Sequence, residues 1–214
     1  MDNVKQYIRD IIDETKRKDA KTILLTFVSI IFLGIALSVL TIMDYGMDPF
    51  TYMNVNIANR LGWSLGNWQL VFNIFLFIPV ILWGKKQIGI GTIFNMVMVG
   101  YTVDFCCWIW NLIGLGAHLS RPVIGIPVML AMVFLFIFSA ATYMSTGLGA
   151  SPVDAPPLIL WQRFPKIPFR VIRFAWDATA VVIGYLLCGE MGIVTILMLL
   201  FLGTAVEMVS KILR

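Results

Sequence analysis

The residues of this sequence that could bind a solute or carry a proton are ionisable and amide side chains set into long apolar stretches. Inside a bilayer such charged groups cost roughly 2.5–3.5 kcal/mol each, so each needs a partner or a function. The candidate substrate-binding residues are Asp48, Gln69, Asn73, Asp154, Arg173 and Asp177, and the candidate coupling or gating residues are Asp104 and Glu207. This set predicts contact with a polar small solute, with proton or cation coupling at the last two acids.

Two pairs among these residues are spaced four apart, which puts both members of a pair on one face of a helix. Arg173 and Asp177 form one pair. Gln69 and Asn73 form the other, at the equivalent place in the first half of the chain if one residue of slippage is allowed. Such pairs either join neighbouring helices by hydrogen bonds or line a hydrophilic cavity. The sequence leaves both roles open.

The four remaining acids fall into two kinds of position. Asp48 and Asp154 lie in Gly/Pro-rich segments, where each could cap a short helix, predicted at 156–162 for Asp154. The exposed N-termini of such half-helices also bind anions. Asp104 and Glu207 lie far along apolar stretches. They either reach headgroup water near a helix end or act in coupling.

The chain offers little for catalysis or metal binding. His118 is its one histidine, and Cys106, Cys107 and Cys188 lie in apolar runs, without the spacing of a metal site or a disulfide framework. No nucleophile–base pair can be assembled, and no Gly-rich phosphate loop is present. We therefore expect no enzymatic activity, no metal and no cofactor.

The elements that position these residues are predicted to be membrane-spanning helices. The chain has 214 residues, of which 59% are hydrophobic and 13% charged, and its mean hydropathy is +0.88. This composition predicts an all-α integral membrane protein in contact with the lipid bilayer. Its net charge of +4 comes from loop residues and gives no support for nucleic-acid binding. Six stretches are long enough to cross a bilayer of about 30 Å, near 22–43, 67–84, 88–113, 122–144, 169–188 and 191–213.

The sequence repeats itself at a spacing of 103 residues. Residues 46–49 (GMDP) return as 149–152 (GASP), and residues 89–93 (GIGTI) return as 192–196 (GIVTI). Such spacing indicates two copies of one structural unit. We therefore divide the chain into a cytoplasmic amphipathic segment (1–21), a first half of three spans (22–113), an external linker (114–121) and a second half of three spans (122–214). The amphipathic segment lies on the lipid surface or is a solvated tail; both remain open.

The positions of the basic residues predict the orientation. With six spans and both termini in the cytoplasm, only Arg60 and Arg121 of the 16 lysines and arginines lie outside. Segments 46–62 and 147–168 are too polar or too rich in proline to span, and we interpret them as re-entrant or interfacial half-helices. Because each half has three spans, the second half is inverted relative to the first, and the two broken segments converge near the bilayer midplane.

The motifs also resemble a known family. The run 33–50 (LGIALSVLTIMDYGMDPF), then 61–66 (LGWSLG) and 89–92 (GIGT), with Gly100 and Asp104, resembles the YczE/YyaS/YitT-type bacterial membrane proteins. The run 147–154 (GLGASPVD), with Arg170 and Arg173 and the stretch 192–203, is similar to that family's second repeat. Val194 stands where second repeats commonly have Gly. The resemblance implies a bacterial inner-membrane protein and carries no binding residues over to this chain.

Three functions remain open at this point. The first is a small-solute transporter working by alternating access between the inverted halves. The second is a substrate-capture subunit that needs an energising partner, and the third is a non-transporting scaffold or regulator in the membrane. The sequence does not fix the solute, its charge, the coupling ion, the direction of transport, or whether the chain forms a homo-oligomer.

Overall fold

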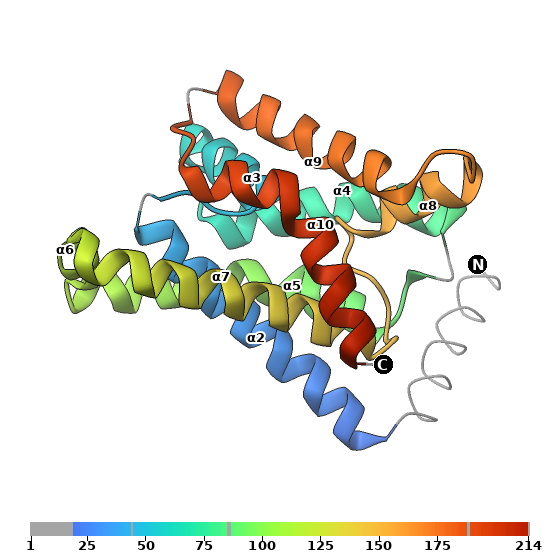
Figure 1. Cartoon of the computed structure of the whole chain (residues 1–214), viewed down its shortest axis with the longest axis horizontal. Helices are drawn as coiled ribbons and strands as arrows, with labels where there is room; N and C mark the ends of the chain where they lie inside the picture. The colour runs from blue at the N-terminus through green and yellow to red at the C-terminus, as the bar shows by residue number, and fades with distance from the viewer. Residues whose placement is uncertain (1–18, 44, 85–86, 188, 214) are drawn as a thin grey trace.

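The computed structural model describes residues 19–43, 45–84, 87–187 and 189–213, and within them it contains helices and no strand (Figure 1). The predicted amphipathic segment lies almost wholly outside these residues. The helices are α2 (Ala20–Ile42), α3 (Pro49–Leu61), α4 (Leu65–Trp83), α5 (Ile90–Leu112), α6 (Leu115–Leu119), α7 (Pro122–Ser145), α8 (Ala155–Arg163), α9 (Phe169–Leu186) and α10 (Ile193–Leu213).

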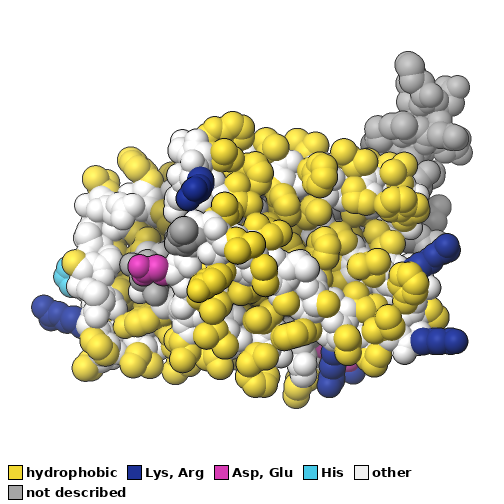
Figure 2. All heavy atoms as spheres, turned by 90° about the horizontal axis from the view of Figure 1, so that it is seen from above, with side chains coloured by type: hydrophobic (Ala, Val, Ile, Leu, Met, Phe, Trp, Pro, Cys, Tyr) yellow, Lys and Arg dark blue, Asp and Glu magenta, His cyan; other side chains and the backbone are white. Residues whose placement is uncertain are grey.

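Five of these helices, α2, α4, α5, α7 and α10, are long and apolar enough to cross a membrane. The predicted all-helical membrane class is therefore confirmed. The stretch predicted as another span, 169–188, forms α9, which has 18 residues and carries Arg170, Arg173 and Asp177. These charges explain why α9 does not qualify by composition. Figure 2 shows hydrophobic side chains over most of the visible face, with only a few Lys and Arg side chains among them, as expected for a protein in contact with lipid.

The short helix α3 begins and ends where local chemistry dictates. Pro49 occupies its first turn, where the missing N–H is not needed. Gly62 ends it in the left-handed conformation, with φ of 68°, which glycine adopts without strain. The neighbouring helix α4 starts after Ser64, whose Oγ accepts a hydrogen bond from the Asn67 N–H at 3.3 Å. The segment predicted as a half-helix thus forms a tight hairpin with α4.

The core is built around α2, which packs against both α5 and α7. Small residues allow a close approach of α2 to α5: a Cβ added at Gly34 would lie 2.7 Å from Thr102. Further along both helices, the Trp110 Nε1 donates to Ser38 Oγ at 2.9 Å. The later residue of α2 thus contacts the later residue of α5, so the two helices run in the same direction.

The directions of α4 and α9 follow from their contacts with α3. In the α3–α4 hairpin, Trp68 Nε1 donates to Asn54 Oδ1 at 2.9 Å, so the two helices are antiparallel. Against α9, the Phe50 ring lies 5.5 Å from that of Trp176 at the start of α3, and the Tyr52 hydroxyl reaches the carbonyl of a residue just beyond α9. Helices α3 and α9 are therefore parallel. It follows that α4 and α9 run in opposite directions, as Figure 1 also shows.

The turn before α3 and the turn before α8 each form the same kind of backbone contact with the opposite half of the chain. The Gly91 N–H at the start of α5 donates to the Leu148 carbonyl at 2.8 Å, and the Val194 N–H at the start of α10 donates to the Tyr45 carbonyl at 2.9 Å. These donors and acceptors occupy corresponding positions, 103 residues apart in the sequence. The turn before α3 therefore contacts the start of α10 in the other half, and the turn before α8 contacts the start of α5.

Two glycine pairs permit this exchange. Gly46 and Gly149 adopt φ of 103° and 106°, conformations that other residues rarely adopt. A Cβ added at Gly89 would lie 2.1 Å from the Leu148 carbonyl oxygen, and one added at Gly192 would lie 2.1 Å from the Tyr45 carbonyl oxygen. The close packing in the second half is thus retained although Val194 replaces the glycine expected from the family.

Candidate functional site

A cavity of about 540 Å³ lies between the two halves of the chain. This volume is within the range of small-molecule sites in proteins. Its lining includes positions that correspond across the repeat, at a spacing of 103 residues: Leu33 and Phe136, Leu37 and Ala140, Asp48 and Ser151, Phe50 and Val153, Thr51 and Asp154, and Val99 and Leu202. The two halves therefore contribute equivalent positions to one shared cavity.

Five of the eight candidate residues line this cavity: Asp48, Gln69, Asp154, Arg173 and Glu207. Asn73, Asp104 and Asp177 do not. The structure thus brings together residues from α4, α9, α10 and both broken segments. It also places apolar side chains such as Leu33 and Phe136 in the same wall.

Asp48 combines a capping role with an unoccupied acceptor. Its Oδ1 accepts hydrogen bonds from the N–H groups of Phe50 and Thr51, both at 3.1 Å, which caps α3. Its Oδ2 has no hydrogen-bond partner among the described residues, although Asp48 is only 8% exposed. One carboxylate oxygen therefore holds the helix, and the other is free at a residue that lines the cavity.

Asp154 does not cap α8, contrary to one of the two roles expected for it. A capping side chain accepts from the second or third N–H of a helix, and here these positions are Pro156 and Pro157, which have no N–H. The carboxylate instead accepts a hydrogen bond from Ser151 Oγ at 2.6 Å and forms an ion pair with Arg173. The two prolines thus leave Asp154 available to α9.

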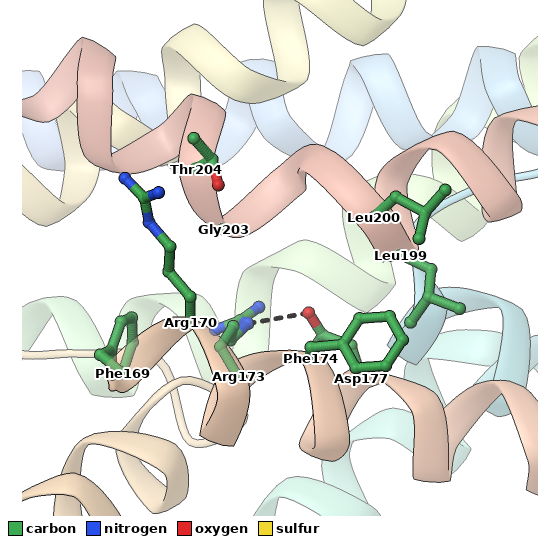
Figure 3. Close-up of a pocket in the computed structure, with 9 residues that line it drawn as sticks. All are labelled: Phe169, Arg170, Arg173, Phe174, Asp177, Leu199, Leu200, Gly203 and Thr204. Atoms are coloured by element: carbon green, nitrogen blue, oxygen red, sulfur yellow. Dashed lines mark hydrogen bonds and ion pairs between the residues drawn. The ribbon is translucent and has the colours of Figure 1, made fainter. Parts of the chain in front are cut away.

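Arg173 and Asp177 form the second half's helical pair as expected. Arg173 Nε donates to Asp177 Oδ2 at 2.9 Å on α9 (Figure 3). Arg173 lines the large cavity and also a smaller one of about 40 Å³ between α9 and α10, whereas Asp177 lines only the smaller one. With Asp154 on its other side, the guanidinium is held by two carboxylates.

In the first half, the corresponding pair is Gln69 and Asn73. One of them lines the cavity and the other joins two helices, so each takes one of the two roles that the sequence left open. Gln69 lines the cavity, and Gly100 of α5 packs against it so closely that a Cβ there would lie 2.8 Å from Gln69 Oε1. Asn73 is buried one turn further along α4, and its Nδ2 donates to the Met96 carbonyl at 3.2 Å. Gln69 therefore can meet a solute, whereas Asn73 joins α4 to α5.

The two candidate coupling acids contact the first turn of a neighbouring helix in their own half. The Asp104 carboxylate accepts hydrogen bonds from the N–H groups of Leu65 and Gly66, at 3.1 and 2.8 Å, and so caps α4. Glu207 lies 3.8 Å from the Arg170 Nε at the start of α9, and Lys211 Nζ donates to it at 2.7 Å. Of these two acids, Glu207 lines the cavity and is half-buried.

Sequence reasoning missed two features of this site. Tyr143 of α7 is 1% exposed and lines the cavity, and its hydroxyl has no hydrogen-bond partner among the described residues. A lone tyrosine in an apolar span carries no periodic signal. The second feature was visible in the sequence: a carboxylate and a hydroxyl spaced three apart occur in both breaks, in opposite order, as Asp48 with Thr51 and as Ser151 with Asp154.

Apolar helices of spanning length packed around a shared cavity define an integral membrane protein. The chain belongs to the family described as "Family of unknown function (DUF6198)", whose model matches residues 20–211. No solved structure matches the chain.

The curated relatives agree with this assignment. An uncharacterized protein of Haemophilus influenzae is 25% identical over 189 residues, which cover 87% of this chain and 82% of the relative. The uncharacterized membrane protein YczE of Bacillus subtilis is 25% identical over 160 residues, covering 74% and 70%. The uncharacterized protein YyaS of the same organism is 28% identical over 173 residues, covering 78% and 81%. The resemblance to YczE/YyaS-type proteins is confirmed.

Proposed function

We propose that this protein is a permease of the bacterial cytoplasmic membrane that moves a small polar solute by alternating access between two inverted halves. The observation that carries the proposal is the shared cavity, to which corresponding positions of the two halves contribute in pairs. A site built on such a symmetry can open to one face or the other by equivalent movements of either half.

The contacts of the helices support the inversion. Helix α4 and its counterpart α9 run in opposite directions, as deduced above. Each half also seats its turn on the last helix of the other, through Gly91 to Leu148 and Val194 to Tyr45. Reciprocal contacts of this kind are expected of two copies related by a two-fold axis. With an axis in the membrane plane, the broken segments before α3 and α8 enter from opposite faces.

The side chains of α9 support its role as the sixth span. Its inner face buries Asp177 and Ala180, whereas Val171, Val182 and Tyr185 are exposed on the outside of the molecule. A transmembrane helix that lines a cavity has this distribution, because charged residues along its length, here Arg173 and Asp177, turn inward and pair with one another, while Arg170 is exposed at its first turn. Six spans then leave both termini in the cytoplasm, in agreement with the positive-inside rule.

The proposal is tested by cysteine accessibility in membrane vesicles of both orientations. The native cysteines are first replaced by serine or alanine, and single cysteines are then introduced as Thr51→Cys in the cavity, Trp63→Cys after α3 and Lys166→Cys after α8. We expect a membrane-impermeant thiol reagent to modify position 51 from both faces, position 63 from outside only and position 166 from inside only. Modification of positions 63 and 166 from the same face would overturn the inversion. Modification of position 51 from one face only would overturn alternating access.

A second measurement separates a permease from a substrate-capture subunit. A capture subunit needs an energising partner, whereas a permease works alone. We expect both-face labelling of Thr51→Cys to persist in liposomes that contain only this purified chain. Its loss on purification, with recovery on adding back a co-purified ATPase module, would favour the capture subunit instead.

A further inference from the structure

Two residues that line the cavity have buried hydrogen-bonding atoms that the described part of the protein does not use. Asp48 Oδ2 and the Tyr143 hydroxyl are buried and have no hydrogen-bond partner there, and both residues line the cavity. Leaving a buried polar atom unpaired is costly. Unpaired buried atoms also occur away from the cavity, at Asn54, Asn73 and Asp177. Asp48 and Tyr143 differ from these because their residues line a solute-sized cavity, where a ligand can supply the missing partner.

The charges around the cavity favour a positive donor. Arg173 is already shared by Asp154 and Asp177. Asp48, the third carboxylate of this inner cluster, accepts two backbone N–H hydrogen bonds through one oxygen, and it also interacts with the Thr51 side chain and with the charge of Arg173. The cluster thus contains three carboxylates and one guanidinium, so its acidic groups outnumber its cation. Glu207, which also lines the cavity, is balanced by Lys211 and Arg170.

The rest of the wall indicates the shape of the ligand. Leu33, Leu37, Val99 and Phe136 line the cavity and favour a carbon skeleton. A hard metal cation requires several oxygen ligands around it, and no group of three or more His, Cys, Asp or Glu residues that could hold one occurs in the described part of the chain. The site therefore matches an organic cation better than an inorganic one.

We propose that the cavity binds a small organic cation, a primary amine with a short apolar chain or ring, whose ammonium group donates a hydrogen bond to Asp48 Oδ2. This inference deepens the proposed function, because it names the substrate class of the same cavity. It differs from the more general expectation of a polar solute, since it excludes anions and neutral polyols as the preferred ligands.

The experiment compares three probes of nearly the same shape on the purified full-length protein in nanodiscs. The probes are phenethylamine, which is a cation, 2-phenylethanol, which is neutral, and phenylacetate, which is an anion. Each is titrated while the thermal unfolding temperature is followed, because a ligand that binds only the folded state raises it. We expect a saturable increase with phenethylamine at lower concentration than with the other two.

The variant Asp48→Asn tests the residue. Asparagine caps helices as well as aspartate does, so α3 is retained while the charge is removed. We expect the variant to bind phenethylamine about tenfold or more weakly, equivalent to about 1.4 kcal/mol. Asp19→Asn, at an exposed residue before α2, is the matched control and should bind as the unmodified protein does.

Several outcomes would overturn the inference. These are equal stabilisation by the three probes, a preference for phenylacetate, no stabilisation by phenethylamine, or an unchanged preference in Asp48→Asn. The labelling test of the permease does not depend on the charge of the ligand. If position 51 reacts from both faces while phenethylamine fails, the substrate class is wrong and the proposed transport function stands.

Discussion

Arg173 Nε lies 2.9 Å from Asp177 Oδ2, and the two side chains are 14% and 2% exposed. They are one turn apart on α9, so the pair is set by the helix itself. The same guanidinium also reaches Asp154 in the segment before α8. A local helical pair is thereby extended into a contact that fixes the broken segment against α9, beside the cavity.

We predict that Arg173→Met destabilises the protein by about 3–5 kcal/mol, because Asp154 and Asp177 lose their shared cation in a buried site. Arg170→Met is the control. Arg170 lies three residues earlier on α9, is 65% exposed and is 3.8 Å from Glu207, and exposed pairs of this kind contribute about 0–1 kcal/mol. Thermal unfolding in nanodiscs measures both. Similar losses in the two variants would contradict the structural role of the Arg173 cluster.

The exchange of turns between the halves gives a second prediction. Gly89→Ala and Gly192→Ala each place a new Cβ 2.1 Å from a carbonyl oxygen of the other half, and because this neighbour is backbone it cannot turn away. We expect each variant to lose about 1–3 kcal/mol of stability, by overpacking. In Gly116→Ala the nearest heavy atom is 3.7 Å away, so that variant should be at least as stable as the unmodified protein. If Gly89→Ala alone is destabilising, the two contacts are not equivalent.

The sequence predicts the elements of this fold well because their boundaries are marked by local chemistry. The stretch predicted as 67–84 forms α4 at Leu65–Trp83, and the short helix predicted at 156–162 forms α8 at Ala155–Arg163. Both helices are bounded by Gly, Pro or Ser residues, which start or end a helix within a few positions of where they stand in the sequence. A helix such as α9 is harder to classify, since its three charges make it polar by composition and only its contacts show that Arg173 and Asp177 lie inside.

The site is less predictable, because its pairings depend on how the helices pack. Five of the eight candidate residues line the cavity, but Asp154 meets Arg173 across 19 positions, and Asp104 meets the first turn of α4 across nearly 40. Helical periodicity pairs residues three or four positions apart, so it predicts neither of these contacts between residues far apart in the sequence. By contrast, the failure of Asp154 to cap α8 was readable from Pro156 and Pro157, which remove the donors that a cap requires.

The position of Asp104 gives a third prediction. Its carboxylate holds two N–H groups of α4 and does not line the cavity. We expect Asp104→Ala to lower the thermal unfolding temperature more than Asp104→Asn, since asparagine keeps an oxygen that accepts one of the two bonds. Hydrogen bonds to charged groups are worth about 1.5–3 kcal/mol, which sets the scale of the loss.

Thiol labelling decides between capping and coupling for this acid. If Asp104 acts by capping α4, Asp104→Asn should leave both-face labelling of Thr51→Cys unchanged. A variant that unfolds at the unmodified temperature but is labelled from one face only would instead assign Asp104 a gating role. Glu207→Gln is the comparison, because Glu207 lines the cavity at the corresponding position of the other half.

Two buried tyrosines give the last prediction, because they are alike in burial and differ in their hydroxyl groups. The Tyr52 hydroxyl donates to the Gly189 carbonyl at 2.7 Å, whereas the Tyr143 hydroxyl has no hydrogen-bond partner among the described residues. Tyr52→Phe should therefore lose about 0.5–1.5 kcal/mol of stability. Tyr143→Phe should lose none, since it removes a buried polar group that is not satisfied within the protein.

The same two variants also separate a ligand-binding hydroxyl from a structural one. If the Tyr143 hydroxyl serves the solute, Tyr143→Phe should weaken the stabilisation by phenethylamine while the unliganded protein unfolds at its usual temperature. Tyr52→Phe should do the reverse, because Tyr52 does not line the cavity. An unliganded Tyr143→Phe protein that unfolds as early as Tyr52→Phe would mean that its hydroxyl is satisfied in the folded state, and the case for a ligand at this side of the cavity would be lost.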